Sequence, residues 1–145
     1  MPGPFIVSYR VPCKGRCRLR LIMEIFDHDN SPHLADAFRI IGQNGLRHAF
    51  CAICLEHWFI LHYEDCGKAF KNGAEALEYL KKFWPQYHKT KSKPYQELRN
   101  RLEVAKVRAR VLMNNQETDV SPAKLNPYFS ICDLISFFEA LKVHE

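Results

Sequence analysis

The sequence lacks a long hydrophobic segment. None of its apolar runs reaches the ~18 residues that a membrane-spanning helix needs, which excludes a protein anchored by such helices. Residues 1–5 also lack the basic-then-apolar order of a secretory signal. We therefore expect a cytoplasmic protein with no membrane partner, whose 6 cysteines stay reduced or bind metal instead of forming disulfides.

Low-complexity tracts, an interdomain linker and any recognisable catalytic signature are absent as well. A chain of 145 residues is long enough to bury the core of one domain. Its apolar fraction of 47% and charged fraction of 26% are ordinary for a globular protein. We expect a single domain over residues 1–145, and a binding or regulatory protein in preference to an enzyme.

The first part of the chain has the pattern of a hairpin followed by a helix. Residues 5–11 and 17–26 alternate between apolar and polar side chains, as the strands of a half-buried antiparallel hairpin do. Ser31-Pro32 then has the form of a helix start, and apolar residues follow it at helical spacing. This predicts a ββα unit over residues 5–42.

The middle of the chain predicts a second ββα unit over residues 46–84. Residues 48–55 and 57–63 are short runs rich in aromatic and β-branched side chains, which favours strands, although one buried helix has a similar pattern. Asn72, with Glu75 three residues later, predicts the start of a helix through a capping box. Together the two units predict an α+β fold with an antiparallel sheet of four to five strands and helices on one side.

The remainder, residues 94–143, is predicted to be helical. Apolar residues at 3-4 spacing from Tyr95 to Leu112 indicate a long helix with a packed seam, and Val104, Val107 and Val111 form a second stripe on the other side. A terminal helix after residue 127 is expected to pack on it. Two apolar sides suggest two partners, one of which could be a second copy of the chain.

Basic residues concentrate in two regions. Arg16, Arg18 and Arg20 alternate along the second strand, where neighbours lie about 7 Å apart, close to the phosphate spacing of an extended nucleic-acid strand. Residues 81–110 contain ten Lys or Arg residues and only two acidic residues. The residues predicted to contact nucleic acid or an acidic protein surface are Arg10, Lys14, Arg16, Arg18, Arg20, Lys89, Lys91, Lys93, Arg99, Lys106 and Arg110. The alternative is a solvated charged surface, or arginines paired with acids inside the chain.

The cysteines offer a candidate zinc site. Cys13, Cys17, Cys51 and Cys54 form two close pairs that could supply four thiolate ligands. A second set combines Cys51 and Cys54 with His62 and Cys66. Buried free thiols are the more common use of such residues, and no other cofactor is expected.

Three functional hypotheses follow. The first is a non-enzymatic protein whose basic surfaces contact nucleic acid or a nucleic-acid-handling complex. The second is a protein-interaction module or inhibitor, dimeric through the seam at residues 95–112. The third is an enzyme, either metal-dependent at Asp27 to Asp29, near a strand end, or thiol-based at Cys66 or Cys132.

Overall fold

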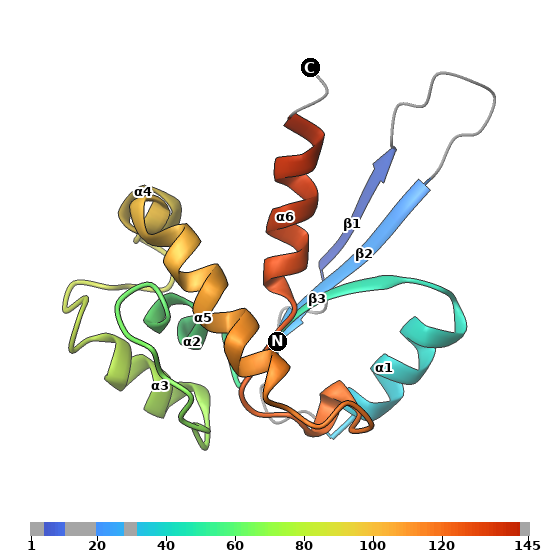
Figure 1. The fold of residues 1–145 in the computed structure, drawn as a ribbon, viewed down its shortest axis with the longest axis horizontal. Helices are drawn as coiled ribbons and strands as arrows, with labels where there is room; N and C mark the ends of the chain where they lie inside the picture. The colour runs from blue at the N-terminus through green and yellow to red at the C-terminus, as the bar shows by residue number, and fades with distance from the viewer. Residues whose placement is uncertain (1–4, 11–19, 28–31, 143–145) are drawn as a thin grey trace.

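A mixed sheet in the order β1-β2-β3-β4 organises the chain (Figure 1). In this computed structural model β1 (Phe5–Arg10) pairs antiparallel with β2 (Arg20–Asp27), and β2 pairs parallel with β3 (Arg47–Ala52). Strand β4 (Tyr128–Phe129) adds a short antiparallel contact to β3. The structure describes the backbone of residues 5–10, 20–27 and 32–142, and the side chains of residues 32–140.

The predicted antiparallel sheet of four to five strands is wrong. Helix α1 (Leu34–Gln43) crosses between β2 and β3, so the two strands run parallel and form a βαβ unit. A parallel pair requires a crossover of this kind, whereas a hairpin turn gives an antiparallel pair. Within the described residues, the one extended antiparallel ladder is therefore β1–β2, and the sheet is not built from two ββα units.

The second predicted unit fails because its second strand is a helix. Helix α2 (Leu55–Ile60) occupies most of the run predicted as a strand over 57–63. Residues 56–60 are all buried, so the segment has no polar face and no helical stripe that periodicity could detect. After an irregular segment, helix α3 (Gly73–Leu80) begins as predicted: the Asn72 side-chain oxygen accepts a hydrogen bond from the Glu75 backbone N–H at 2.9 Å.

The helical part of the chain is more broken than its sequence pattern indicates. The single helix predicted from residue 94 to 114 is divided into α4 (Pro94–Leu98), the 3-10 turn η1 (Arg99–Arg101) and α5 (Leu102–Asn114). The last helix, α6 (Ile131–Lys142), begins directly after β4. None of the helices in the described ranges has the length and apolarity that would let it cross a bilayer.

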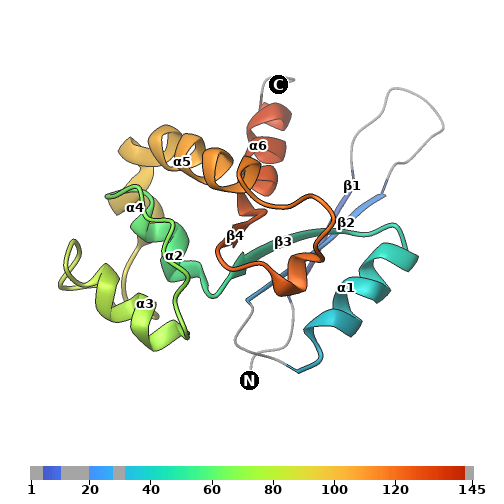
Figure 2. The ribbon, with the colours of Figure 1, turned by 60° about the horizontal axis from the view of Figure 1, so that its bottom comes forward.

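Strand β3 separates two apolar clusters. Cys51 belongs to the main core, where α2, α3, α4 and α5 meet beyond the end of the strand (Figure 2). Phe50 and Ala52, one residue to either side, point to the opposite face and pack with Leu34 of α1. This alternation is the period of two expected of a strand that is covered on both faces.

The apolar seam of α4 and α5 packs inside the chain. Leu98, Ala105 and Ala109 are at most 3% exposed and belong to the main core. These side chains are therefore not available to a second copy of the chain, and we do not propose a dimer through residues 95–112. Val104 and Val107 of the second stripe are instead about half exposed, at 48% and 57%.

Candidate functional site

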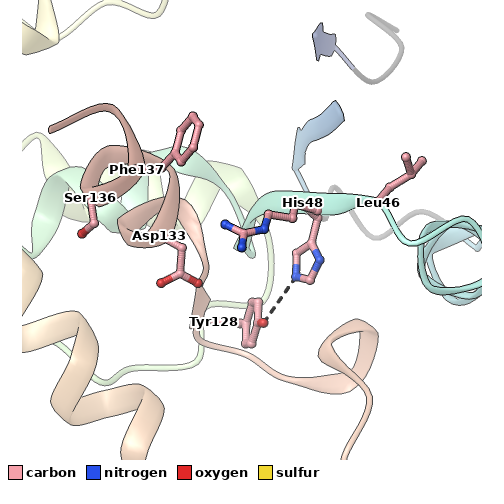
Figure 3. Close-up of a pocket in the computed structure, with 7 residues that line it drawn as sticks. Leu46, His48, Tyr128, Asp133, Ser136 and Phe137 are labelled. Atoms are coloured by element: carbon pink, nitrogen blue, oxygen red, sulfur yellow. Dashed lines mark hydrogen bonds between the residues drawn. The ribbon is translucent and has the colours of Figure 1, made fainter. Parts of the chain in front are cut away.

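A pocket of about 670 Å³ lies beside the first half of β3, between this strand and α6 (Figure 3). Its walls come from three elements that are far apart in the sequence: β3 and the residue before it, β4, and the first two turns of α6. The lining residues are Leu46, Arg47, His48, Tyr128, Asp133, Ser136 and Phe137. Charged, hydroxyl and aromatic side chains thus meet in one concave site, as in many ligand sites.

The pocket exists because the pairing of β3 with β4 ends early. Ser130, the residue after β4, closes the ladder: its N–H donates to the Phe50 carbonyl at 2.9 Å, and its Oγ accepts from the Phe50 N–H at 2.8 Å. Helix α6 begins at the next residue and leaves the strand. His48 and Phe50 are two residues apart in β3, so their backbone groups point to the same edge of the strand. At Phe50 this edge is bonded to Ser130, whereas at His48 it faces the pocket and not another strand.

His48 and Tyr128 form a stacked aromatic pair in the pocket wall. Their ring centroids are 6.3 Å apart with an interplanar angle of 26°, and the His48 Nε2 and Tyr128 hydroxyl are 3.4 Å apart. The ring of Phe38 from α1 contacts His48 edge-on at 5.0 Å. Burial lowers the pKa of His48 against the opposing effect of Asp133, and burial, with the Asp133 charge, raises the pKa of Tyr128. Both rings are therefore uncharged at neutral pH.

Arg47 and Asp133 bring opposite charges to the pocket without neutralising each other. Both side chains are exposed, and among the described residues neither forms an ion pair or a side-chain hydrogen bond. Arg47 lies at the first position of β3, and Asp133 lies in the first turn of α6. In Figure 3 the carboxylate of Asp133 lies near Tyr128, the ring that pairs with His48. The pocket can thus offer hydrogen-bond donors from the guanidinium and acceptors from the carboxylate.

The predicted basic residues do not form one surface. Arg10 and Arg20 are register partners at one end of the β1–β2 ladder, whereas α4, which adjoins the exposed Lys93 and Arg99, lies on the far side of α5 and α6 (Figure 1). Lys14, Arg16 and Arg18 lie outside the described residues. Lys91 and Arg110 are exposed. The arrangement therefore separates the hairpin from the lysine-rich segment.

Two of the predicted basic residues are engaged inside the protein. Lys106 is only 4% exposed, and its Nζ donates to Glu103 at 2.9 Å and to Glu139 of α6 at 2.7 Å. These hydrogen bonds raise the pKa of Lys106, and the ion pair with Glu139 connects α5 with α6. Lys89 lies 3.4 Å from the buried carboxylate of Glu56. Lys106 is thus largely buried and paired with two acids, and its predicted contact with an external partner stays a prediction.

The cysteines of the described ranges have the environment of buried thiols. Burial raises the pKa of Cys54 to about 12 and that of Cys132 to about 11, and it also raises the pKa of Cys66. A nucleophile or metal ligand needs the thiolate, which such environments disfavour. No group of three or more His, Cys, Asp or Glu residues in the described part of the chain is arranged to hold a metal ion.

This finding overturns the second zinc set. Cys51, Cys54, His62 and Cys66 do not converge, and the Nδ1 of His62 is occupied by the Trp58 carbonyl at 3.0 Å. The first set, with Cys13 and Cys17, lies partly outside the described residues, so it stays a prediction.

Of the predicted acidic group Asp27 to Asp29, Asp27 lies at the carboxyl edge of the parallel pair, and the other residues lie outside the described ranges. Asp27, the last residue of β2, is the register partner of Cys51, the next-to-last residue of β3. Helix α2 begins just beyond, with Cys54 at its N-cap position. Its second residue, Glu56, is buried at 3% exposure and accepts a hydrogen bond from the Tyr87 hydroxyl at 3.1 Å. This edge of a βαβ unit is where ligands commonly bind in open parallel sheets.

Sequence reasoning missed the pocket residues. Arg47 and His48 are a polar pair at the start of an apolar run, which is a weak signal that ordinary strand ends share. Tyr128 and Asp133 lie in a different part of the chain, and no local pattern links them to His48. Only the contact among β3, β4 and α6 brings these side chains together.

In the described part of the chain, the fold and site define an α+β protein with a βαβ unit and a polar pocket at the open edge of β3. A comparison with protein families matches residues 18–138 to the family described as RloB-like protein, and the chain belongs to this family. Searches of curated proteins and of solved structures found no match.

Proposed function

We propose that this RloB-like protein binds nucleic acid at the pocket beside β3. The observation that carries the proposal is the exposed guanidinium of Arg47, which forms no ion pair with any described residue and lies in a pocket with aromatic walls. Guanidinium groups bind phosphate or base edges, and aromatic rings accept stacked bases. The same chemistry suits a single-stranded nucleic acid better than a flat protein surface.

The strand register limits how far this contact extends along the sheet. Arg47 is the register partner of Met23, and Arg20 lies three residues earlier on β2, opposite Arg10. Successive residues of a strand alternate between the two faces of the sheet, so this odd separation places Arg20 and Arg10 on the face opposite to Arg47. The proposed contact is therefore centred on Arg47 and does not include these two arginines.

Binding is tested by fluorescence anisotropy with a labelled single-stranded oligonucleotide at several salt concentrations. We expect affinity to fall steeply with salt, and Arg47→Gln to weaken binding by about 1–3 kcal/mol at a fixed salt concentration. Arg39→Gln is the matched control, because Arg39 is an exposed arginine of α1 that pairs with Asp36. Absence of binding at low salt, or equal affinities of the two variants, would contradict the proposal.

A second candidate function is metal-dependent chemistry on the bound nucleic acid. It is favoured by the position of Asp27 at the carboxyl edge of the parallel β2–β3 pair, next to the start of α2. Carboxylates at such an edge are suitable ligands for Mg²⁺ or Mn²⁺, which assist phosphoryl transfer.

Cleavage of an oligonucleotide in the presence of Mg²⁺ or Mn²⁺ tests this candidate. Asp27→Asn should abolish the metal-dependent cleavage, whereas Asp65→Asn, at an exposed acid in the loop before α3, should leave it unchanged. Calorimetric titration with Mn²⁺ gives a second readout, in which Asp27→Asn weakens metal binding. If the wild type neither cleaves nor binds the metal, the protein is a binding protein without this activity.

A further inference from the structure

The pocket beside β3 contains hydrogen-bonding groups that the protein itself does not use. Arg47, Asp133 and Ser136 all line it, and within the described ranges none of their side chains has an ion pair or a hydrogen bond. A guanidinium and a carboxylate that share a pocket without pairing are suited to a ligand that carries acceptors on one edge and donors on another.

The aromatic wall adds a requirement for a planar ligand. The rings of His48 and Tyr128 are close to parallel, at 26°, and their polar atoms lie 3.4 Å apart, within reach of each other. This aromatic pair forms a wall of the pocket that also contains Arg47 and Asp133, and these two charged groups are left to form hydrogen bonds with a ligand. A pocket of about 670 Å³ is within the usual range for a ligand of nucleotide size, roughly 300–1,000 Å³.

We infer that this pocket recognises a guanine base of single-stranded nucleic acid. Among the bases, guanine presents two acceptors, O6 and N7, that match the guanidinium of Arg47. It also presents two adjacent donors, N1–H and the N2 amino group, that match both oxygens of the Asp133 carboxylate. Adenine and cytosine have a ring-nitrogen acceptor beside their amino group. This acceptor would be repelled by an oxygen of the Asp133 carboxylate, which is also an acceptor. Thymine has a single imide donor between two carbonyl oxygens, which would face it unfavourably too.

The inference also explains why the target is single-stranded. In a duplex the N1–H and N2 groups of guanine are paired with cytosine, so a carboxylate reaches both only when the base is unpaired. The inference rests on the proposed nucleic-acid binding and adds base specificity to it. Arg47 then contacts the base in the pocket.

The test compares labelled single-stranded DNA octamers that differ at one central base in a thymine background. The guanine octamer should bind roughly tenfold more tightly than those with adenine, cytosine or thymine, as expected for one well-formed bidentate contact. Asp133→Asn should remove this preference while retaining binding to the thymine octamer. Asp119→Asn, the same change at an exposed acid outside the pocket, should keep the preference.

Competition on the wild-type protein gives an independent readout that does not depend on a variant. Free GMP should displace the guanine octamer at lower concentration than AMP does. Equal affinities for all four octamers, with salt-dependent binding intact, would overturn the guanine inference and leave the proposed function standing. Absence of binding to every octamer at low salt would overturn both.

Discussion

Ser130 ties the start of α6 to β3, and its replacement by alanine tests how the pocket is held in place. The Ser130 side chain is 3% exposed, and its Oγ accepts from the Phe50 N–H at 2.8 Å. Phe50 is itself fully buried, at 0% exposure. In Ser130→Ala the buried N–H of Phe50 loses its hydrogen bond to the Ser130 Oγ.

The expected cost follows from that lost hydrogen bond. Removing the side-chain acceptor of a buried backbone N–H costs about 1–3 kcal/mol, more than the net value of an ordinary hydrogen bond. Ser130→Ala should therefore lower the free energy of unfolding by about that amount, measured from urea-induced unfolding followed by circular dichroism. The midpoint should fall while the slope of the transition is unchanged, because the surface exposed on unfolding is the same.

Ser136→Ala is the matched control, since Ser136 lies in the same helix, lines the same pocket and has no side-chain hydrogen bond among the described residues. Ser136→Ala should change the free energy of unfolding by no more than about 0.5 kcal/mol. If the two alanine variants unfolded at the same urea concentration, the Ser130–Phe50 contact would not be what holds α6 against β3.

Three further predictions concern the main core and the helix start. Asn72→Ala should cost about 1 kcal/mol in urea unfolding, because it removes the N-cap acceptor for Glu75; an unchanged midpoint would argue against this cap. Leu80→Ala, at 0% exposure, should cost about 2–5 kcal/mol, whereas Val107→Ala, at a 57% exposed position, should cost less than about 1 kcal/mol; equal losses would contradict the placement of the core. Burial lowers the pKa of His57 from 6.5 to about 4, so the unfolded state binds the proton more readily, and stability should fall as the pH drops from about 6.5 towards 4, by at most about 3 kcal/mol. In His57→Gln the loss over this pH range should be smaller, and an equal loss would assign the pH dependence to other groups.

The parts of the fold that the sequence predicted correctly are segments with one solvent-exposed side and one buried side. Helix α1 was expected from Leu34, Phe38 and Ile41, and Leu34 and Ile41 are buried. The start of α3 was expected from Asn72, whose capping bond is formed. In both segments the signal is local: an apolar stripe at helical spacing, or a side chain that bonds a backbone group three residues away.

The errors have a common physical origin in burial and long-range contact. Helix α2 is enclosed on all sides, so its sequence has no polar side, and its aromatic residues resemble those of a strand. The parallel pairing of β2 and β3 depends on the path that α1 takes over the sheet. The residues of the two strands do not predict that path. Lys106 was assigned to the surface because lysine usually lies there, but Glu103 and Glu139 compensate its charge inside.

The sequence by itself determined the alternating hairpin, the amphipathic α1, the capped start of α3 and the concentration of basic residues. Each of these depends on neighbours within a few positions, where the period of a helix or strand and the chemistry of a cap act directly. Tertiary structure alone decided the direction of β3, the helical state of α2 and the pocket of Arg47, His48, Tyr128 and Asp133. Those features depend on which distant segments pack together and exclude water, and on the hydrogen bonds between Ser130 and Phe50 that hold the start of α6 at the edge of the sheet.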